Sequence, residues 1–424
     1  MKRKLISVLL CLSVLLVSGC HSEPELVVHQ GEEQQAEIAD FDYEQYLISG
    51  GKTPNGNGQG IINPAERKLS DFYVRLIRNV LVSEENTVFS PLNIYLNLAA
   101  LAGLAQGEAR DEIINVLGVN EDSLVYDYQT IWKNNYTDNG KTVTQFANSI
   151  WLNDSVKFNE DILKQESEYF YLPVFAGDMG SEDYHKAFKS WLNDNTGKLL
   201  GNHISGIEIS PTTMMMLAST IYHTNRWQYE FEKEKTALGV FHGNEQDVKV
   251  DMMHKTAAIM YHKGSDYASC LDAFGDGGAF MIIMPDEGVS IFELINRDEI
   301  GQLLSSPVNS FEPARVELSL PKFDTDSKLK LEETLPELGI TSIFASEKKP
   351  FGELTETAMA VDKIEHACRV IVDEEGIKAA AYTVETMYGG AGPDEIVKMT
   401  VDRPFIFVEY KENSILFCGV IYQL

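Results

Sequence analysis

Apolar residues recur every three or four positions in several stretches of the chain, which predicts amphipathic helices. The first stretch holds Leu69, Phe72, Leu76, Ile77 and Val80. A second helix is expected to follow Ser90, which is a suitable N-cap because Pro91 comes directly after it. Further helices are predicted at residues 108–117, 160–169, 183–195 and 329–338.

Short apolar or alternating runs predict strands between these helices. They lie at residues 87–89, 146–152, 214–222, 280–284, 315–320, 361–372, 404–409 and 414–422. Helices and strands alternate without a fixed repeat and without a clear boundary. The pattern therefore predicts one mixed α+β domain over residues 64–424.

Residues 372–393 fit neither pattern alone. Ile377, Ala379, Ala381 and Thr383 alternate onto one face, as in a strand. Glycines flank these residues on both sides, as in a loop. The pattern predicts a segment that can be either loop or strand.

The N-terminus predicts a targeting segment. A basic start precedes an apolar run that ends in Val17-Ser18-Gly19-Cys20. This resembles a bacterial lipoprotein signal, with residues 1–19 removed and Cys20 lipidated; the alternative is an ordinary signal peptide. Residues 20–63 are acidic and end in a Gly-rich run, which predicts a flexible tether.

Composition and motifs exclude several functions. The net charge of −29 argues against nucleic-acid binding. Phosphate-loop, hydrolase and metalloprotease motifs are absent, so neither an enzyme, a metal site nor a cofactor is indicated. His223 and His366 are expected to be buried structural residues, and Cys368 and Cys418 buried thiols.

Six segments together resemble the serpin family of protease inhibitors. They are N-T-V-F-S-P-L at 86–92, A-N-S-I-W at 147–151, W-L-N-D-N-T-G-K at 191–198, L-A-S-T-I-Y-H-T-N-R-W at 217–227, L-P-K-F at 320–323 and D-R-P-F-I-F at 402–407. Each motif is weak, but six in order are specific. Ser219, Thr220 and His223 depart from the usual family residues.

The resemblance implies a fold with three β-sheets, about nine helices and an exposed reactive-centre loop. A target protease cleaves this loop, forms an acyl-enzyme and is trapped when the loop inserts into the main sheet. The native state must then be metastable. The resemblance assigns the hinge of the loop to Glu374, Glu375, Gly376, Ile377, Lys378, Ala379, Ala380 and Ala381. It assigns the shutter and breach, where the main sheet opens, to Asn86, Ser90, Pro91, Asn148 and Trp227.

The cleaved bond is less closely defined. Counting forward from Glu374 by the family's interval gives Gly390-Ala391, which suits an elastase-like protease. Counting back from the C-terminal motif gives a position three residues later. Met387 or Tyr388 would suit chymotrypsin-like, subtilisin-like or papain-like enzymes. Glu385 falls on the inward face and is the least favourable residue for insertion.

The main expectation is therefore a monomeric inhibitor that forms a covalent complex with an endopeptidase. The alternative is a non-inhibitory binding lipoprotein on the same scaffold. The lipid at Cys20 would anchor the protein in a membrane. His21, Glu23 and Glu25 favour the outer membrane or cell surface of a Gram-negative bacterium.

Overall fold

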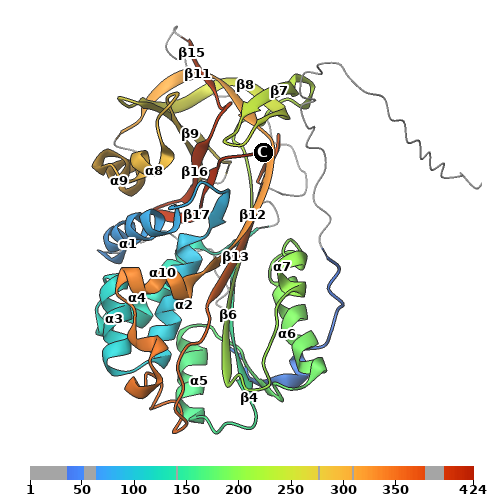
Figure 1. Cartoon of the computed structure of the whole chain (residues 1–424), viewed down its shortest axis with the longest axis vertical. Helices are drawn as coiled ribbons and strands as arrows, with labels where there is room; N and C mark the ends of the chain where they lie inside the picture. Colours follow the sequence, from blue (N-terminus) through green and yellow to red (C-terminus); the bar gives the residue numbers. More distant parts are fainter. Residues whose placement is uncertain (1–35, 52–63, 140–141, 276, 308–309, 378–395) are drawn as a thin grey trace, which may run out of the picture.

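The computed structural model describes residues 36–51, 64–139, 142–275, 277–307, 310–377 and 396–424. These residues form two β-sheets and ten α-helices (Figure 1). The first sheet runs along the long axis of the molecule, and much of the second lies toward one end. The predicted α+β class is confirmed.

The first sheet has eight strands, in the order β1-β5-β4-β6-β14-β13-β12, with β3 paired to β4. Their bounds are β1 Leu47–Ser49, β3 Thr137–Asp138, β4 Val143–Asn153, β5 Val174–Gly177, β6 Met215–Arg226, β12 Phe323–Lys330, β13 Glu365–Val372 and β14 Gly376–Ile377. The two-residue strand β14 lies between β6 and β13, and this is where the site forms.

The second sheet has nine strands, in the order β15-β11-β8-β9-β10-β16-β17-β2, with β7 paired to β8. Their bounds are β2 Thr87–Phe89, β7 Ala237–His242, β8 Asp247–Lys263, β9 Tyr267–Ala273, β10 Ala279–Pro285, β11 Glu312–Pro321, β15 Ile396–Thr400, β16 Phe405–Lys411 and β17 Ser414–Ile421. The 17-residue strand β8 pairs with β7 and β11 along most of its length and with β9 at its end. The expected fold has three sheets. In this structure two of them are joined through β8 and form one nine-stranded sheet.

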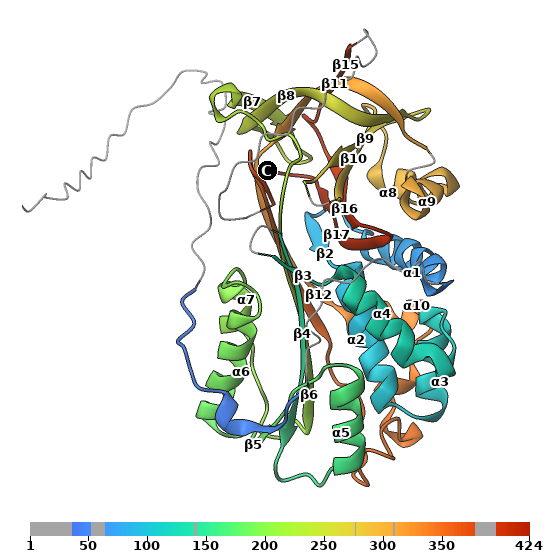
Figure 2. The ribbon, with the colours of Figure 1, turned by 180° about the vertical axis from the view of Figure 1, so that it is seen from behind.

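Ten α-helices are present in the described residues, close to the nine expected. They are α1 Pro64–Val80, α2 Pro91–Leu104, α3 Gly107–Leu117, α4 Leu124–Asn135, α5 Glu160–Tyr169, α6 Glu182–Asp194, α7 Gly201–Ser205, α8 Ile291–Ile295, α9 Asp298–Ser305 and α10 Leu331–Leu338. Helices α6 and α7 lie on one face of the first sheet, whereas α2 to α5 and α10 lie on the other (Figures 1 and 2).

Most predicted elements are found near their predicted positions. Ser90 caps α2 by accepting a hydrogen bond from the amide of Asn93 at 3.1 Å, and Pro91 starts the helix, as expected. Two boundaries need correction. Residues 329–330 belong to β12 rather than to a helix, and residues 361–364 precede β13, which begins at Glu365.

The tether prediction needs correction for residues 36–51. This segment runs along the outer side of α6 and α7 and ends as β1, paired with β5 (Figure 2). Phe41, Tyr43 and Tyr46 pack against the aromatic cluster that joins α6 to the first sheet. Aromatic side chains thus hold a segment whose acidic and polar composition alone suggests a solvated linker.

Candidate functional site

The hinge begins as a strand. Gly376 and Ile377 lie opposite Arg226 and Asn225 of β6, and Ile377 also lies opposite Val372 of β13. Gly376 has a φ of +146°, and a Cβ there would lie 2.2 Å from the carbonyl oxygen of Asn225. Only glycine fits this conformation so close to another backbone. The two residues bridge strands that have no direct register with each other among the described residues.

A cavity of about 730 Å³ lies between β6 and β13, beyond Ile377. Residues of both strands line it, and we call it the slot. Side chains of α2 lie on one side of the slot, and side chains of α6 and α7 lie on the other. Because β6 and β13 do not pair directly here, the slot has the arrangement required to receive one more strand.

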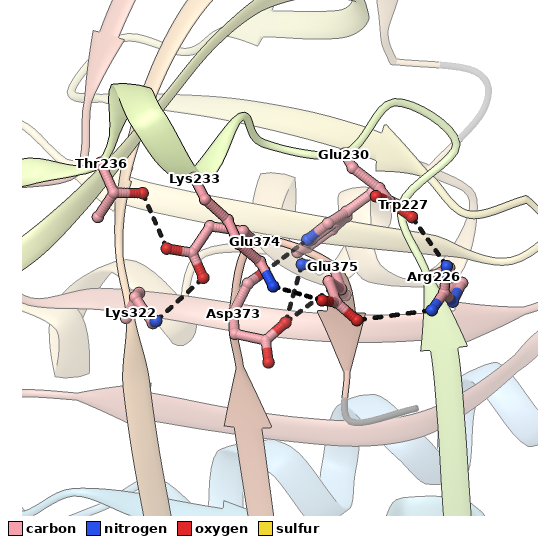
Figure 3. Close-up of polar contacts among 10 residues, drawn as sticks. Arg226, Trp227, Glu230, Lys233, Thr236, Lys322, Asp373, Glu374 and Glu375 are labelled. Carbon is pink, nitrogen blue, oxygen red and sulfur yellow. Dashed lines mark hydrogen bonds and ion pairs between the residues drawn. The ribbon is translucent and has the colours of Figure 1, made fainter. Parts of the chain in front are cut away.

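Residues 226–231 hold the backbone of the hinge from above (Figure 3). The Trp227 amide donates to the Glu375 carbonyl at 3.1 Å, and the Trp227 indole donates to the Asp373 carbonyl at 2.9 Å. The Phe231 amide donates to the Glu374 carbonyl at 2.9 Å. Three consecutive hinge carbonyls are therefore bound by two residues of one loop.

The acidic pair of the hinge is held by charge. Glu374 pairs with Lys322 at 3.0 Å and accepts from the Thr236 hydroxyl at 2.8 Å. Burial alone would raise the pKa of the Glu374 carboxyl, but hydrogen bonds from Lys322 and Thr236, among others, lower it overall. Glu375 is more exposed and pairs with Lys233 at 2.5 Å and Arg226 at 3.5 Å (Figure 3). We call the residues of this and the preceding paragraph the hinge cluster.

A second group of polar contacts lies deeper along the slot and consists of Ser90, Asn93, Ser219 and His366. Of the residues that the resemblance assigned to the shutter and breach this group holds only Ser90, and from here on "the shutter" means these four residues. The Ser90 amide donates to Nε2 of His366 at 3.0 Å, and the Ser219 hydroxyl donates to the Asn93 side chain at 2.6 Å. Burial lowers the pKa of His366 to about 4, so its imidazole is neutral at pH 7 and can accept this bond.

The structure places the predicted site residues in different surroundings. Glu374, Glu375, Gly376 and Ile377 form the hinge, and Trp227 holds it. Ser90 and Pro91 start α2 beside the slot. Lys378, Ala379, Ala380, Ala381, Glu385, Met387, Tyr388, Gly390 and Ala391 lie outside the described residues, as does Cys20.

Two predicted residues lie away from the slot lining. Asn86 accepts from the amides of Tyr422 and Gln423 and so fixes the C-terminal end of the chain. Asn148 donates to the Tyr128 hydroxyl at 2.8 Å, between β4 and α4. Both residues make structural contacts, and neither lines the slot.

Sequence reasoning missed Asn93, Ser219 and Lys322 as site residues. Lys322 lies within the L-P-K-F motif, and Asn93 follows the F-S-P segment, so each was close to a recognised signal. Their partners are distant in sequence, however, and only the fold brings them together. His223 and His366 are buried and bonded, as expected: His223 contacts Glu409 at 2.6 Å and Thr144 at 2.8 Å.

Other kinds of site are not supported in the described part of the chain. It contains no group of three or more His, Cys, Asp or Glu residues arranged to hold a metal ion. No helix there combines the length and apolar character needed to span a membrane. Cys270, Cys368 and Cys418 are buried free thiols.

The profile of the family described as "Serpin (serine protease inhibitor)" matches residues 67–424. The chain belongs to the serpin family. Human neuroserpin is 25% identical over 386 residues, which cover 84% of this chain and 90% of neuroserpin. Most serpins inhibit proteases and some do not, so membership alone leaves the function of this serpin to be argued.

Solved serpin structures share the fold. Native tengpin, a thermophilic serpin, matches with a TM-score of 0.77 and 22% identity, covering 92% of this chain and all of tengpin. Thyroxine-binding globulin, in complex with thyroxine, matches with a TM-score of 0.74 and 21% identity, covering 85% and 99%. These similarities confirm the serpin fold predicted from the six motifs.

Proposed function

We propose that this serpin is a suicide inhibitor of endopeptidases, principally serine endopeptidases with cysteine endopeptidases as a second class. The observation that carries the proposal is the slot, whose entrance is already occupied by Gly376 and Ile377. A cleaved loop that continues this strand would lie between β6 and β13 and pair with both of them. Strand addition of this kind supplies a large driving force through backbone hydrogen bonds.

The register of the hinge predicts where each loop residue would go. Each step along the loop from Ile377 moves one residue back along β6 from Asn225. Ala381 would then lie opposite Ile221, and residue 387 would reach Met215 at the end of β6. The 12 residues of β6 thus match residues 376–387, a strand of about 40 Å at about 3.4 Å per residue.

The side chains of the loop suit this register at most positions. On β13, Ala381 would lie opposite Cys368, by counting four residues from the Ile377–Val372 pair. Thr383 would lie opposite Ser219 and His366, where a hydroxyl meets polar groups. Small side chains therefore enter first, which favours fast insertion before the acyl bond is hydrolysed.

Glu385 is the position that opposes the proposal. By the same count it would lie opposite Leu217 and Ile364, and an unpaired carboxylate among apolar groups is costly. This residue supports a second candidate function, a non-inhibitory binding lipoprotein whose loop is cleaved without inserting. The two candidates predict different products of cleavage.

The proposed target is elastase-like, with cleavage at Gly390-Ala391. Residues 379–397 contain neither Lys nor Arg, so a trypsin-like target is not expected. Met387 and Tyr388 remain candidate residues for a chymotrypsin-like, subtilisin-like or papain-like enzyme. Mass spectrometry of the C-terminal peptide released by elastase should find Ala391 at its N-terminus.

Incubation with elastase, cathepsin G or subtilisin tests the mechanism. We expect an SDS-stable adduct and a rise in melting temperature after cleavage. Ala381→Arg should abolish the adduct and give a cleaved substrate, because this side chain would enter the slot. Tyr382→Arg is the matched control, since it adds the same charge on the opposite face of the strand, away from α2. Cleavage of the wild type without adduct and without thermal gain would support the binding lipoprotein instead.

We also propose that Cys20 carries a lipid that anchors the inhibitor to the outer membrane or cell surface. The basic start, the apolar run and V-S-G-C support this placement. Cys20→Ser should release the protein from the membrane fraction. Protease shaving of intact cells should remove the wild type if it faces outward.

A further inference from the structure

Lys255 is a buried cation that does not itself contact the described residues of the hinge. Its side chain, on β8, is 6% exposed and pairs with Asp272 of β9, which is 4% exposed. The ammonium group also donates to the carbonyl oxygen of Tyr229 at 2.9 Å. Burial raises the pKa of the Asp272 carboxyl, although Lys255 acts to lower it. A buried ion pair of this kind gives little net stability by itself, so stabilisation alone does not account for it.

Two aromatic rings complete the surroundings of this cation. The Lys255 ammonium lies 4.1 Å from the ring centroid of Phe231 and 4.8 Å from that of Trp227. The rings are 5.8 Å apart and nearly perpendicular, and Trp227 also stacks on Phe274. A desolvated cation over a ring is attracted more strongly than an exposed one, and Lys255 is a partner that both rings share.

Trp227 and Phe231 are the residues whose N–H groups bind the carbonyls of Asp373, Glu374 and Glu375. A shift of the Trp227 ring therefore moves the indole donor away from Asp373, and a shift of the Phe231 ring disturbs the packing that orients the Phe231 amide toward Glu374. Lys255 contacts Trp227 and Phe231 directly, and each of these two residues contacts the hinge directly. Asp272 contacts Lys255 but makes none of these contacts with the hinge.

We propose that Lys255 is a positioning residue for the hinge, which holds Trp227 and Phe231 in place and thereby sets how readily the hinge strand leaves or extends into the slot. The inference deepens the proposed inhibitory function and rests on it for its consequence. Its immediate effect concerns the uncleaved protein. It can therefore be measured without any protease.

Hydrogen–deuterium exchange of the hinge amides in the full chain is the test. Lys255→Met should speed exchange at residues 374–377 by about tenfold or more, since the rings lose their common partner. Lys255→Arg should restore most of the protection. Asp272→Asn is the matched control: it removes the carboxylate charge but keeps a side-chain oxygen that can accept from Lys255 beside the rings, so melting should fall while hinge exchange changes less than about threefold.

Tryptophan emission gives a second readout that a general loss of stability would not produce. The contribution of Trp227, obtained by subtracting the spectrum of the same protein carrying Trp227→Phe, should change in Lys255→Met and return in Lys255→Arg. If Lys255→Met does not fold, Phe231→Leu decides, because it removes a ring but keeps the amide donor. It should also speed hinge exchange.

Unchanged hinge exchange in Lys255→Met, or in Phe231→Leu, would overturn the proposal even if melting falls. Equal acceleration by Asp272→Asn would also overturn it, because the ion pair rather than the ring contact would then matter. Failure of the wild type to form an adduct is a separate result. It would sink the inhibitory function and leave the exchange measurements standing.

Discussion

The hinge cluster and the shutter hold the same slot by different chemistry. At the hinge cluster, two backbone amides and the Trp227 indole bind the carbonyls of residues 373–375, and charged groups bind the carboxylates of Glu374 and Glu375. At the shutter, neutral groups pair in the buried interior, as in the bond from the Ser90 amide to His366. The first region is partly open to solvent, whereas Ser90, Asn93 and His366 of the second are buried.

This difference gives the two regions different roles in the proposed insertion. The hinge cluster lies where the strand starts, so it must bind the hinge and still release it. Charge and exposure allow this at Glu375, because water can replace its contacts with Lys233 and Arg226 at modest cost. The shutter lies deeper, where water does not replace a broken hydrogen bond. Its donors and acceptors would stay unsatisfied, so its bonds resist opening until the inserting strand arrives.

The largest effect is expected from Gly376→Val, which would remove the attachment of the hinge. The φ of +146° and the 2.2 Å approach to Asn225 exclude a side chain. The strain should cost about 3 kcal/mol locally and unpair β14 from β6. Exchange of the Ile377 amide should rise by about two orders of magnitude. The shutter should stay intact, and exchange of the Ser90 amide reports on it. Loss of protection at both positions would show that the regions are not independent.

The sequence predicted the fold and the start of the hinge. It did not predict the side-chain contacts that form the hinge cluster and the shutter. The α2 start at Ser90-Pro91 and the glycine of the hinge are local signals, so they were recognised. The bond from Ser90 to His366 joins residues 276 positions apart, and no periodicity reports such a contact. Lys255 and Asp272 face each other only because β8 and β9 form one sheet.

Other misses had a usable signal. Val248, Val250 and Met252 alternate with polar residues at the start of β8, so the strand could have been predicted. Phe41, Tyr43 and Tyr46 stand out in the acidic N-terminal segment. They pack against the α6 cluster, which explains why residues 36–51 are not a tether.

The second prediction separates the two glutamates of the hinge. Glu374→Lys places a cation against Lys322 in a side-chain site that is 8% exposed, and should cost about 2 kcal/mol. Glu375→Lys is the matched control, because Glu375 is 28% exposed and should matter less. Urea-unfolding midpoints compare them. The swap Glu374→Lys with Lys322→Glu should recover much of the loss; no recovery would argue against the pair.

The third prediction uses pH to address the shutter. The pKa of His366 is lowered from 6.5 to about 4, so the unfolded chain takes up the proton first. Stability should be full above pH 6.5 and fall as pH decreases toward 4, by about 2 kcal/mol between pH 7 and 5. His366→Gln keeps an acceptor for the Ser90 amide and should flatten this slope. An identical slope in the variant would contradict the assignment.

The hinge cluster should respond in a different pH range. The pKa of Glu374 is lowered from 4.5, so its contribution is present above pH 4.5 and is lost as pH falls through the lower folded value. Glu374→Gln should therefore change the pH profile only below about pH 5. A change near pH 6 would mean that the two regions titrate together.

The smallest effect is expected from salt, and it should reach only the hinge cluster. Lys233 is 63% exposed, and its pair with Glu375 is open to screening. Raising NaCl from about 0.05 to about 0.5 M should speed hinge exchange by about twofold, and Lys233→Gln should reduce the salt dependence. The Ser90 and Asn93 amides should not respond, because their partners are neutral and buried. Equal salt sensitivity at both places would erase the distinction between a charged hinge cluster and a neutral shutter.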